Sequence, residues 1–194
     1  MALSFHDMTT SHSVGFLLYQ LAKNQEKQEI LYQEIDYLLP SKESKITPEV
    51  FTQLRYVKGC LKESQRLFPI IPGVARKLMK EVVIAGYRIP AGTIVIVNNR
   101  EICRQEKYFK NALAFEPERW LDREPLVHRF SFLPFGYGVR SCMGRRLAEL
   151  EIICLTTEII RQFKVEYHHE DIDILTRLIN TPDKPLKFKF TSRH

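Results

Sequence analysis

One short segment constrains this chain more than any other. It spans Phe135–Gly144, reads Phe-Gly-Tyr-Gly-Val-Arg-Ser-Cys-Met-Gly, and directly precedes a helical pattern. Five of its positions fit F-x-x-G-x-R-x-C-x-G, a pattern that average composition produces about 10⁻⁵ to 10⁻⁴ times per chain of this length. Glycines let a backbone approach a flat ligand closely, and a cysteine offers a thiolate. The segment therefore predicts a ligand-binding loop that leads into a helix.

This loop resembles the signature of the cytochrome P450 family, whose members hold haem through a cysteine thiolate. The resemblance implies that Cys142 ligates the iron of haem b and that Phe135 forms an apolar wall beside the sulfur. Gly138 and Gly144 would let N–H groups point toward the sulfur and tune its charge. Arg140 offers a guanidinium fork to a haem propionate. The alternative is a glycine-rich turn with an ordinary buried cysteine, which the number of matched positions disfavours.

A pair of oppositely charged residues lies upstream of the loop. Glu63 and Arg66 stand three positions apart, so they share a helix face and can pair. The spacing alone carries no weight because it recurs in the chain, but its context, Leu61–Pro69, resembles the K-helix of the family. The segment Phe115–Trp120 resembles the family's P-E-R-F/W motif. The resemblance implies that Arg119 bridges to Glu63 in a buried charged triad that locks the loop beneath the haem.

Two further positions come from the resemblance. Arg76 falls where the family has another propionate partner, and a solvated strand arginine is the alternative. Thr9 matches the hydroxyl that the family places on the oxygen side of the haem, in the motif A-G-x-D/E-T-T. Here Met8 replaces the acid of that motif and His6 replaces its glycine. We expect that residues 1–8 are not the authentic upstream sequence; a genuine departure would put normal proton delivery in doubt.

Hydrophobic periodicity predicts helices first and short strands later. Helices are expected over 13–39 with a break at Asn24, from Thr47 to Arg66 as one helix or two, and from about Arg145 to Phe163. Strands are expected at 82–84, 87–89 and 93–97, and in a terminal pair over 175–191 that turns at 182–185. Residues 98–134 are expected to be irregular, with short helical pieces. This order predicts a mainly α fold with small β-sheets, an α+β class, in one partial domain over 1–194.

The chain carries a formal net charge of +6, with a hydrophobic content of 44%. The excess of basic residues raises nucleic-acid binding as an alternative. Acidic residues are interleaved with the basic ones, as in Glu26–Glu34, and no basic block with interleaved aromatics occurs. We therefore expect no nucleic-acid partner, and the charge fits better with one docking face for an acidic protein.

The longest apolar runs lie around Gly15–Ala22 and Ile152–Leu155 and are too short to cross a bilayer. The first residues have neither the regions of a signal peptide nor the Arg-rich pattern of a transit peptide. The four cysteines show no C-x-x-C spacing, so no disulfide framework is expected. Cys60 and Cys154 lie in apolar helical patterns, which predicts that both are buried.

Basic residues gather on one face of the expected K-helix. Arg55, Lys58 and Lys62 lie together at helical spacing, and such a stripe suits an acidic electron donor because complementary charge steers docking. A solvated basic face is the alternative. Paired lysines at these positions, and arginines directly after the ligand loop, resemble the mitochondrial class of the family. The resemblance implies that an adrenodoxin-like [2Fe–2S] ferredoxin docks at Lys58, Lys62, Arg145 and Arg146.

The resemblance as a whole implies a monooxygenase that inserts one oxygen atom from O₂ into a lipophilic substrate, a sterol or steroid in many mitochondrial members. It implies a location at the matrix side of the mitochondrial inner membrane, with contact to the membrane surface in the full-length protein. A microsomal enzyme of the endoplasmic reticulum that uses a flavoprotein reductase is the alternative class. The general character of the sequence is similar to arthropod members.

The resemblance covers residues 9–191, which is less than half of a whole family member. The helices and loops that roof the substrate pocket lie outside it. A second hypothesis is therefore a truncated, non-catalytic product that cannot hold haem. Such a chain would expose half of the haem pocket and much of its core.

Overall fold

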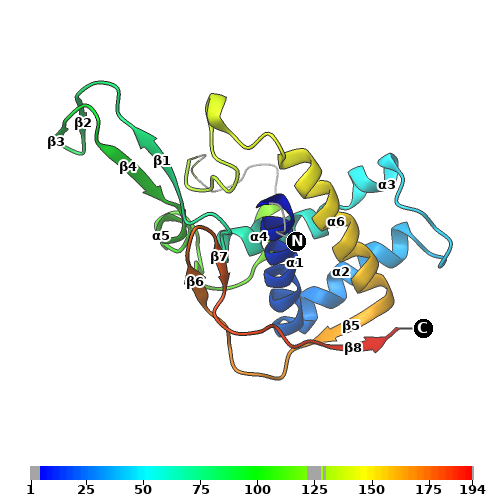
Figure 1. Cartoon of the computed structure of the whole chain (residues 1–194). Helices are drawn as coiled ribbons and strands as arrows, with labels where there is room; N and C mark the ends of the chain where they lie inside the picture. Colours follow the sequence, from blue (N-terminus) through cyan, green and yellow to red (C-terminus); the bar gives the residue numbers. More distant parts are fainter. Residues whose placement is uncertain (1–4, 122–127, 129, 194) are drawn as a thin grey trace.

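The computed structural model describes residues 5–121, 128 and 130–193. A body of helices carries a β ribbon that extends away from it, as Figure 1 shows. The helices are α1 (Phe5–Lys23), α2 (Gln25–Leu38), α3 (Pro48–Gln53), α4 (Arg55–Leu67), α5 (Asn99–Cys103) and α6 (Arg145–Gln162), with 3-10 turns η1 (Pro117–Trp120) and η2 (Gly138–Arg140). The strands are β1 (Gly73–Lys77), β2 (Val82–Ile84), β3 (Tyr87–Ile89), β4 (Ile94–Asn98), β5 (Phe163–Glu166), β6 (Ile174–Thr176), β7 (Asn180–Pro182) and β8 (Lys189–Ser192). The predicted mainly α class with small sheets is confirmed.

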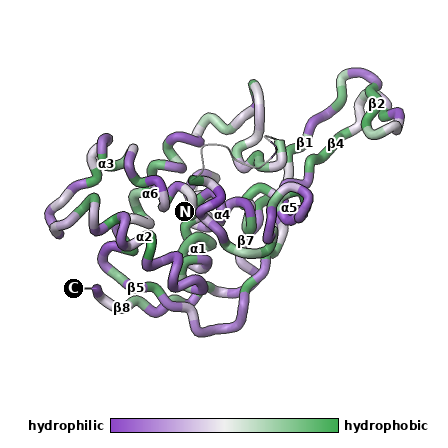
Figure 2. The backbone as a smooth tube through the Cα atoms, turned by 180° about the vertical axis from the view of Figure 1, so that it is seen from behind, coloured by the Kyte–Doolittle hydropathy of each residue, from purple (hydrophilic) through white to green (hydrophobic). Residues whose placement is uncertain are grey.

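Helix α1 lies within the helical body and supplies much of the core. Its residues Phe16, Leu17 and Leu21 are fully buried, and Figure 2 shows this apolar stretch among the other helices. A helix that is apolar on several sides needs several neighbours, and α1 packs against α2, α4 and α6. Phe68 follows α4 and stacks on Phe16 with ring centroids 4.8 Å apart. Burial of this apolar surface is the main force that assembles the helices.

The helix boundaries follow local signals and one contact between helices. The predicted break at Asn24 is confirmed, and the Oγ1 atom of Thr47 accepts from the N–H of Val50 at 3.3 Å to cap α3. Helix α4 begins without a side-chain cap from its own N-cap residue. The carboxylate of Glu34, on α2, instead accepts from the first three N–H groups of α4 at 2.9, 2.7 and 3.2 Å. A carboxylate at the positive end of a helix stabilises that end.

The strands of the described part pair in four two-stranded antiparallel sheets. In the ribbon β1 lies opposite β4, with Gly73 facing Asn98, and the β2–β3 hairpin forms the tip (Figure 1). The sequence patterns did not indicate β1. Among the described residues, no helix is long and apolar enough to cross a membrane.

The predicted terminal β pair with a turn at 182–185 is wrong. β6 pairs with β7 across a turn at 177–179, while β8 pairs with β5, directly after α6. The reason is that β5 needs partners for its backbone groups. The amide of Gln28, buried on α2, donates to the carbonyl of Val165 at 2.8 Å and accepts from its N–H at 2.9 Å. β8 pairs along the same strand, so the tail is used to complete β5 rather than to fold on itself.

Candidate functional site

The Cys142 loop, defined as residues Phe135–Gly144, is a tight turn before α6. Gly136 and Gly138 have φ angles of +74° and +73°, in the left-handed region that favours glycine. The N–H of Cys142 donates to the carbonyl of Phe135 at 2.9 Å and closes the loop. Helix α6 then begins at Arg145, so its positive end lies next to the cysteine. The loop therefore places Cys142 directly before the N-terminus of α6.

The four cysteines differ in accessibility. All are free thiols; Cys60 and Cys103 are buried, Cys154 is half-buried, and Cys142 is exposed. The expectation of burial is therefore correct for Cys60 and only partly correct for Cys154. Burial raises the pKa of the Cys103 thiol to about 12 and also raises the pKa of the Cys60 thiol. Cys142 is thus the most accessible of the four residues.

The structure brings six of the predicted site residues to the walls of one cleft of about 520 Å³. Of these six predicted residues, one lies on α1, one on β1 and four in the Cys142 loop. These six are Thr9, Arg76, Phe135, Arg140, Cys142 and Gly144. Apolar side chains complete the lining, among them Ile71, Val74, Leu133 and Ile152. An apolar cleft with a few convergent polar groups is typical of a small-molecule or cofactor site.

These residues fit a haem. Within the described part of the chain, no three His, Cys, Asp or Glu side chains form a metal-binding group. An iron porphyrin needs one cysteine thiolate from the protein, because the macrocycle supplies the equatorial ligands. Two guanidinium groups, those of Arg76 and Arg140, line the same cleft and suit anionic substituents. The guanidinium of Arg76 also donates to the carbonyl of Tyr137 at 3.5 Å, which ties β1 to the loop.

The α1 side of the cleft carries the residues with an altered motif. The hydroxyl of Thr9 donates to the carbonyl of His6 at 3.0 Å. His6 also lines the cleft, and its Nε2 atom lies 2.9 Å from the carboxylate of Glu151 on α6. The Oγ1 atom of Thr10 is buried and has no hydrogen-bond partner among the described residues. Thr9, Thr10 and His6 thus form the α1 side of the cleft, and His6 is paired with Glu151 of α6.

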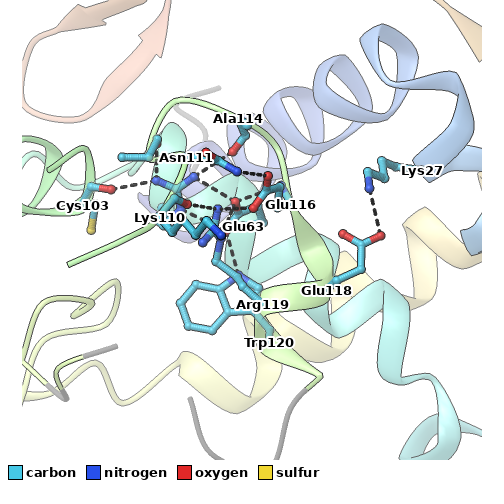
Figure 3. Close-up of polar contacts among 12 residues, drawn as sticks. Lys27, Glu63, Cys103, Lys110, Asn111, Ala114, Glu116, Glu118, Arg119 and Trp120 are labelled. Atoms are coloured by element: carbon cyan, nitrogen blue, oxygen red, sulfur yellow. Dashed lines mark hydrogen bonds and ion pairs between the residues drawn. The ribbon is translucent and has the colours of Figure 1, made fainter. Parts of the chain in front are cut away.

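A second polar centre, the Glu63 network, comprises Glu63, Arg66, Glu116, Arg119 and Trp120. Figure 3 shows the polar contacts around Glu63. Glu63 and Arg66 are fully buried. Arg66 donates to both carboxylate oxygens of Glu63 at 2.9 and 2.8 Å, and Nε of Arg119 donates to Oε1 at 2.9 Å. The structure therefore brings together the three residues that the sequence paired. Bidentate hydrogen bonds and full burial favour this one arrangement of the side chains over other packings.

The structure adds partners that the sequence analysis missed. The indole N–H of Trp120 donates to Oε2 of Glu63 at 2.8 Å, and the N–H of Glu116 donates to Oε1 at 3.0 Å. Arg66 donates further to the carbonyls of Cys103, Ala112 and Ala114 at 2.7, 2.5 and 2.9 Å. The tryptophan of the P-E-R-W segment could have been suspected from its type. The carbonyl acceptors have no signal in the sequence because every residue carries one.

Contacts connect the Glu63 network to the start of the Cys142 loop. The ring of Phe132 lies 4.7 Å from that of Trp120, centroid to centroid. The thiol of Cys103 donates to the carbonyl of Ser131 at 3.2 Å. The amide of Asn99 donates to the carbonyl of Leu133 at 3.3 Å. Trp120 of the network and two residues of α5, Asn99 and Cys103, therefore hold the segment from which the loop emerges.

The four residues expected to dock a ferredoxin have different surroundings. Lys62 is exposed, with its ammonium 5.7 Å from the ring centre of Trp120. Arg145 is exposed and pairs with Glu149 at 3.0 Å, and Arg146 is exposed as well. Lys58, in contrast, is half-buried and donates to backbone carbonyls.

Comparison with known proteins gives a consistent result. The model of the family described as "Cytochrome P450" matches residues 7–190. The chain is 42% identical to probable cytochrome P450 12a5, mitochondrial, of Drosophila melanogaster, over 94% of the chain and 37% of that protein. It is 37% identical to the mitochondrial 1,25-dihydroxyvitamin D(3) 24-hydroxylase of Mus musculus, over 95% of the chain and 36% of that protein. The chain thus spans little more than a third of the length of these curated relatives.

Proposed function

The chain belongs to the cytochrome P450 family, and on that premise we propose that the whole protein is a haem-thiolate monooxygenase that inserts one oxygen atom from O₂ into a lipophilic substrate. One observation carries this proposal: Cys142, Arg76, Arg140 and Thr9 line a single cleft. The cleft combines a soft anionic ligand, two cationic groups and a hydroxyl on apolar walls. Haem b, when bound, would supply the electron-transfer and oxygen chemistry.

Each residue of the cleft has a role under this proposal. The thiolate of Cys142 would hold the iron, and the N-terminus of α6 would stabilise its negative charge. Arg76 and Arg140 would bind the anionic edge of the cofactor. Phe135 would exclude water from the sulfur. Thr9 would hold a proton at its Oγ1 atom on the oxygen side.

Under this proposal the Glu63 network positions the Cys142 loop. Residues 131–133, which precede the Cys142 loop, contact Trp120 of the network and also Cys103 and Asn99 of α5. Arg66 of the network donates to the carbonyl of Cys103. A buried charged cluster contributes specificity of arrangement more than net stability. We infer that its role is to fix the loop in the geometry that the cofactor needs.

The partner, location and substrate are inferred from the class. Relatives from Drosophila melanogaster and Mus musculus are named mitochondrial proteins. This supports a [2Fe–2S] ferredoxin of the adrenodoxin type as electron donor, and the matrix side of the mitochondrial inner membrane as location. A sterol or steroid is the substrate class we propose; the mouse relative is named as a hydroxylase of 1,25-dihydroxyvitamin D(3).

A second candidate is that the 194 residues by themselves do not hold haem. The exposure of Cys142 and of the apolar side chains of Val139, Met143 and Leu147 around it favours this candidate. A haem bound to this chain alone would be open to water on one side, which weakens thiolate ligation.

The carbon-monoxide difference spectrum of the reduced, haem-reconstituted protein tests the proposal. A band at the position typical of thiolate ligation is expected, and Cys142→Ser must abolish it. Cys154→Ser is the matched control, since it removes a half-buried thiol of α6 and should leave the band unchanged. If the 194-residue chain is folded and yields no band while a longer form of the protein does, the second candidate holds for the chain. A band that survives in Cys142→Ser would overturn the assignment of the ligand.

A further inference from the structure

Two side chains in the wall of the cleft lack the hydrogen bonds that polar groups of their kind usually form. Gln65 of α4 lines the cleft and is only 8% exposed. Within the described part of the chain, its side-chain amide makes no hydrogen bond. Thr10 of α1 lines the same cleft, and its buried Oγ1 atom has no partner among the described residues. Helices α1 and α4 pack against each other, so two neighbouring helices each contribute one unpaired polar group to the cleft.

The amide of Gln65 is an exception within this structure. The other buried side-chain amides of the described residues all form hydrogen bonds; they are those of Gln20, Gln28, Asn99 and Asn180. Asn99 is the best comparison because it also lines the cleft, and it donates to the carbonyl of Leu133 at 3.3 Å. A buried polar group without a partner loses its hydration and gains nothing in return. Gln65 therefore indicates a partner that the chain itself does not supply.

The hydroxyl of Thr10 is an exception within its own helix. A hydroxyl inside a helix usually bonds to a carbonyl about one turn earlier. The hydroxyls of Thr9, Ser11 and Ser13 do so, at 3.0, 3.1 and 2.8 Å. Thr10 has carbonyls at the same positions of the helix before it, but its Oγ1 atom bonds to none of them. This hydroxyl is therefore available to a molecule that fills the cleft.

The chemistry of the two groups selects a neutral partner. A threonine hydroxyl and a glutamine amide each donate and accept hydrogen bonds. An anion would instead be drawn to the guanidinium groups of Arg76 and Arg140, which belong to β1 and the Cys142 loop. The oxygen of an alcohol or of water also donates and accepts, so it matches both unpaired groups. Ile70 and Ile71 line the same cleft and suit the carbon skeleton of a lipophilic molecule.

We propose that Thr10 and Gln65 form a hydroxyl-binding subsite in the cleft, which holds water in the absence of a substrate and the alcohol group of a lipophilic substrate when one binds. The proposal deepens the proposed function and rests on it, since it assumes a lipophilic substrate in the cleft beside the haem. Neither residue is among those assigned to the cofactor. A contact of this kind orients the substrate and disfavours analogues that lack the alcohol, because the two polar groups are then left unpaired.

Thermal unfolding of the 194-residue protein tests whether Gln65 has a partner within the chain. Gln65→Leu should leave the melting temperature unchanged or raise it, because the substitution removes an unpaired polar group from an apolar wall. Asn99→Leu is the matched control: it removes a bonded amide from the same cleft and should lower the melting temperature by about 2 to 4 °C. Equal decreases in the two variants would show that protein groups hold Gln65 and would overturn the subsite.

A pair of sterols that differ by one hydroxyl group tests the ligand. In equilibrium dialysis, the haem-loaded protein should bind cholesterol about five- to tenfold more tightly than 5-cholestene, which lacks the alcohol. Gln65→Leu and Thr10→Val should each reduce this ratio to about twofold. Ser13→Ala is the matched control and should leave the ratio unchanged. Ser13 also lines the cleft, but its hydroxyl is already bonded to the carbonyl of Thr9 at 2.8 Å.

The double variant Thr10→Val/Gln65→Leu tests whether both residues bind the same alcohol. Its ratio should fall no further than in the single variants, because groups that share one ligand atom are coupled. Losses that multiply would contradict a shared subsite, and so would a preference for cholesterol that survives both substitutions.

The remaining outcomes separate this inference from the proposed function. Equal affinity of the unsubstituted protein for the two sterols would limit the partner to water and overturn the contact with substrate. Binding of neither sterol would overturn the subsite as a substrate contact, while the carbon-monoxide difference spectrum would still decide the haem-thiolate assignment. A protein that shows no thiolate band but prefers cholesterol through Thr10 and Gln65 would retain the subsite and lose the proposed function.

Discussion

The Glu63 network and the Cys142 loop are connected through residues 131–133 but are held in opposite ways. In the network, Glu63 and Arg66 are fully buried, and both carboxylate oxygens of Glu63 accept from several donors. In the loop, Cys142 is exposed, and the side chains of Val139 and Met143 are fully exposed beside it. The polar groups of the network find their partners within this chain, while the side chains of the loop are exposed to solvent.

The difference teaches which part of the site depends on a bound group. A buried carboxylate is tolerated only with charged and hydrogen-bonding partners, so the network must be complete in the folded chain. The loop has a fixed backbone, through its two left-handed glycines and the bond between Cys142 and Phe135, but its cysteine is exposed. We therefore expect changes in the network to alter stability, and changes in the loop to alter ligation.

The largest expected difference between the two regions is in thiol reactivity. With iodoacetamide at pH 8, Cys142 should be alkylated rapidly, while Cys103, buried beside Arg66, should react at least about a thousandfold more slowly. The reason is that a thiol with a pKa of about 12 has a thiolate fraction of about 10⁻⁴ at this pH. Peptide mass spectrometry over time measures both rates.

Loading the protein with haem should block Cys142 and leave the slow rate of Cys103 unchanged, and removal of the haem should restore the reactivity. Alkylation of Cys103 at a rate similar to that of Cys142 would mean that the network region opens readily, which contradicts the contrast.

Glu63→Gln should destabilise the fold by about 3 to 5 kcal/mol, because it leaves Arg66 as a buried charge without a counter-charge. Glu116→Gln is the matched control. The carboxylate of Glu116 accepts from Arg119 at 3.0 Å but is a third exposed, so its loss should cost no more than about 1 kcal/mol. Urea unfolding followed by circular dichroism measures both losses of unfolding free energy. Equal losses would show that the buried carboxylate of Glu63 contributes no more to stability than the partly exposed carboxylate of Glu116.

Trp120→Phe should destabilise the fold by about 1.5 to 3 kcal/mol. The substitution keeps most of the ring contact with Phe132 but removes the N–H that donates to Glu63 at 2.8 Å, and hydrogen bonds to charged groups have this magnitude. Thermal unfolding measures the change. A cost near zero would exclude Trp120 as a member of the network.

Cys142→Ser should change the stability of the haem-free protein by less than about 0.5 kcal/mol, since exposed substitutions rarely do more. The same urea titration measures this change. A cost comparable with that of Trp120→Phe would mean that the loop is held by its side chain and not by its backbone.

Much of the local structure was predictable from sequence because its causes are local. The break at Asn24, the cap at Thr47 and the helix after Gly144 depend on residues close in the chain. Glu63 and Arg66 were expected to share a face because three positions in a helix bring side chains together. The tail was mispredicted because its strands were matched to each other, while β5, the strand that directly follows α6, was the partner of β8.

The sequence by itself determined the family, the identity of the loop cysteine and the order of the elements, since these are properties of residue type and spacing. Only the tertiary structure decided that Trp120 and Glu116 join Glu63, that Glu34 caps α4 from another helix, and that six residues from three separate segments share one cleft. The physical reason is that these contacts join side chains and backbone groups from segments that are remote in the sequence. Many residues carry groups of the same kinds, so only the packing of the chain selects which of them meet.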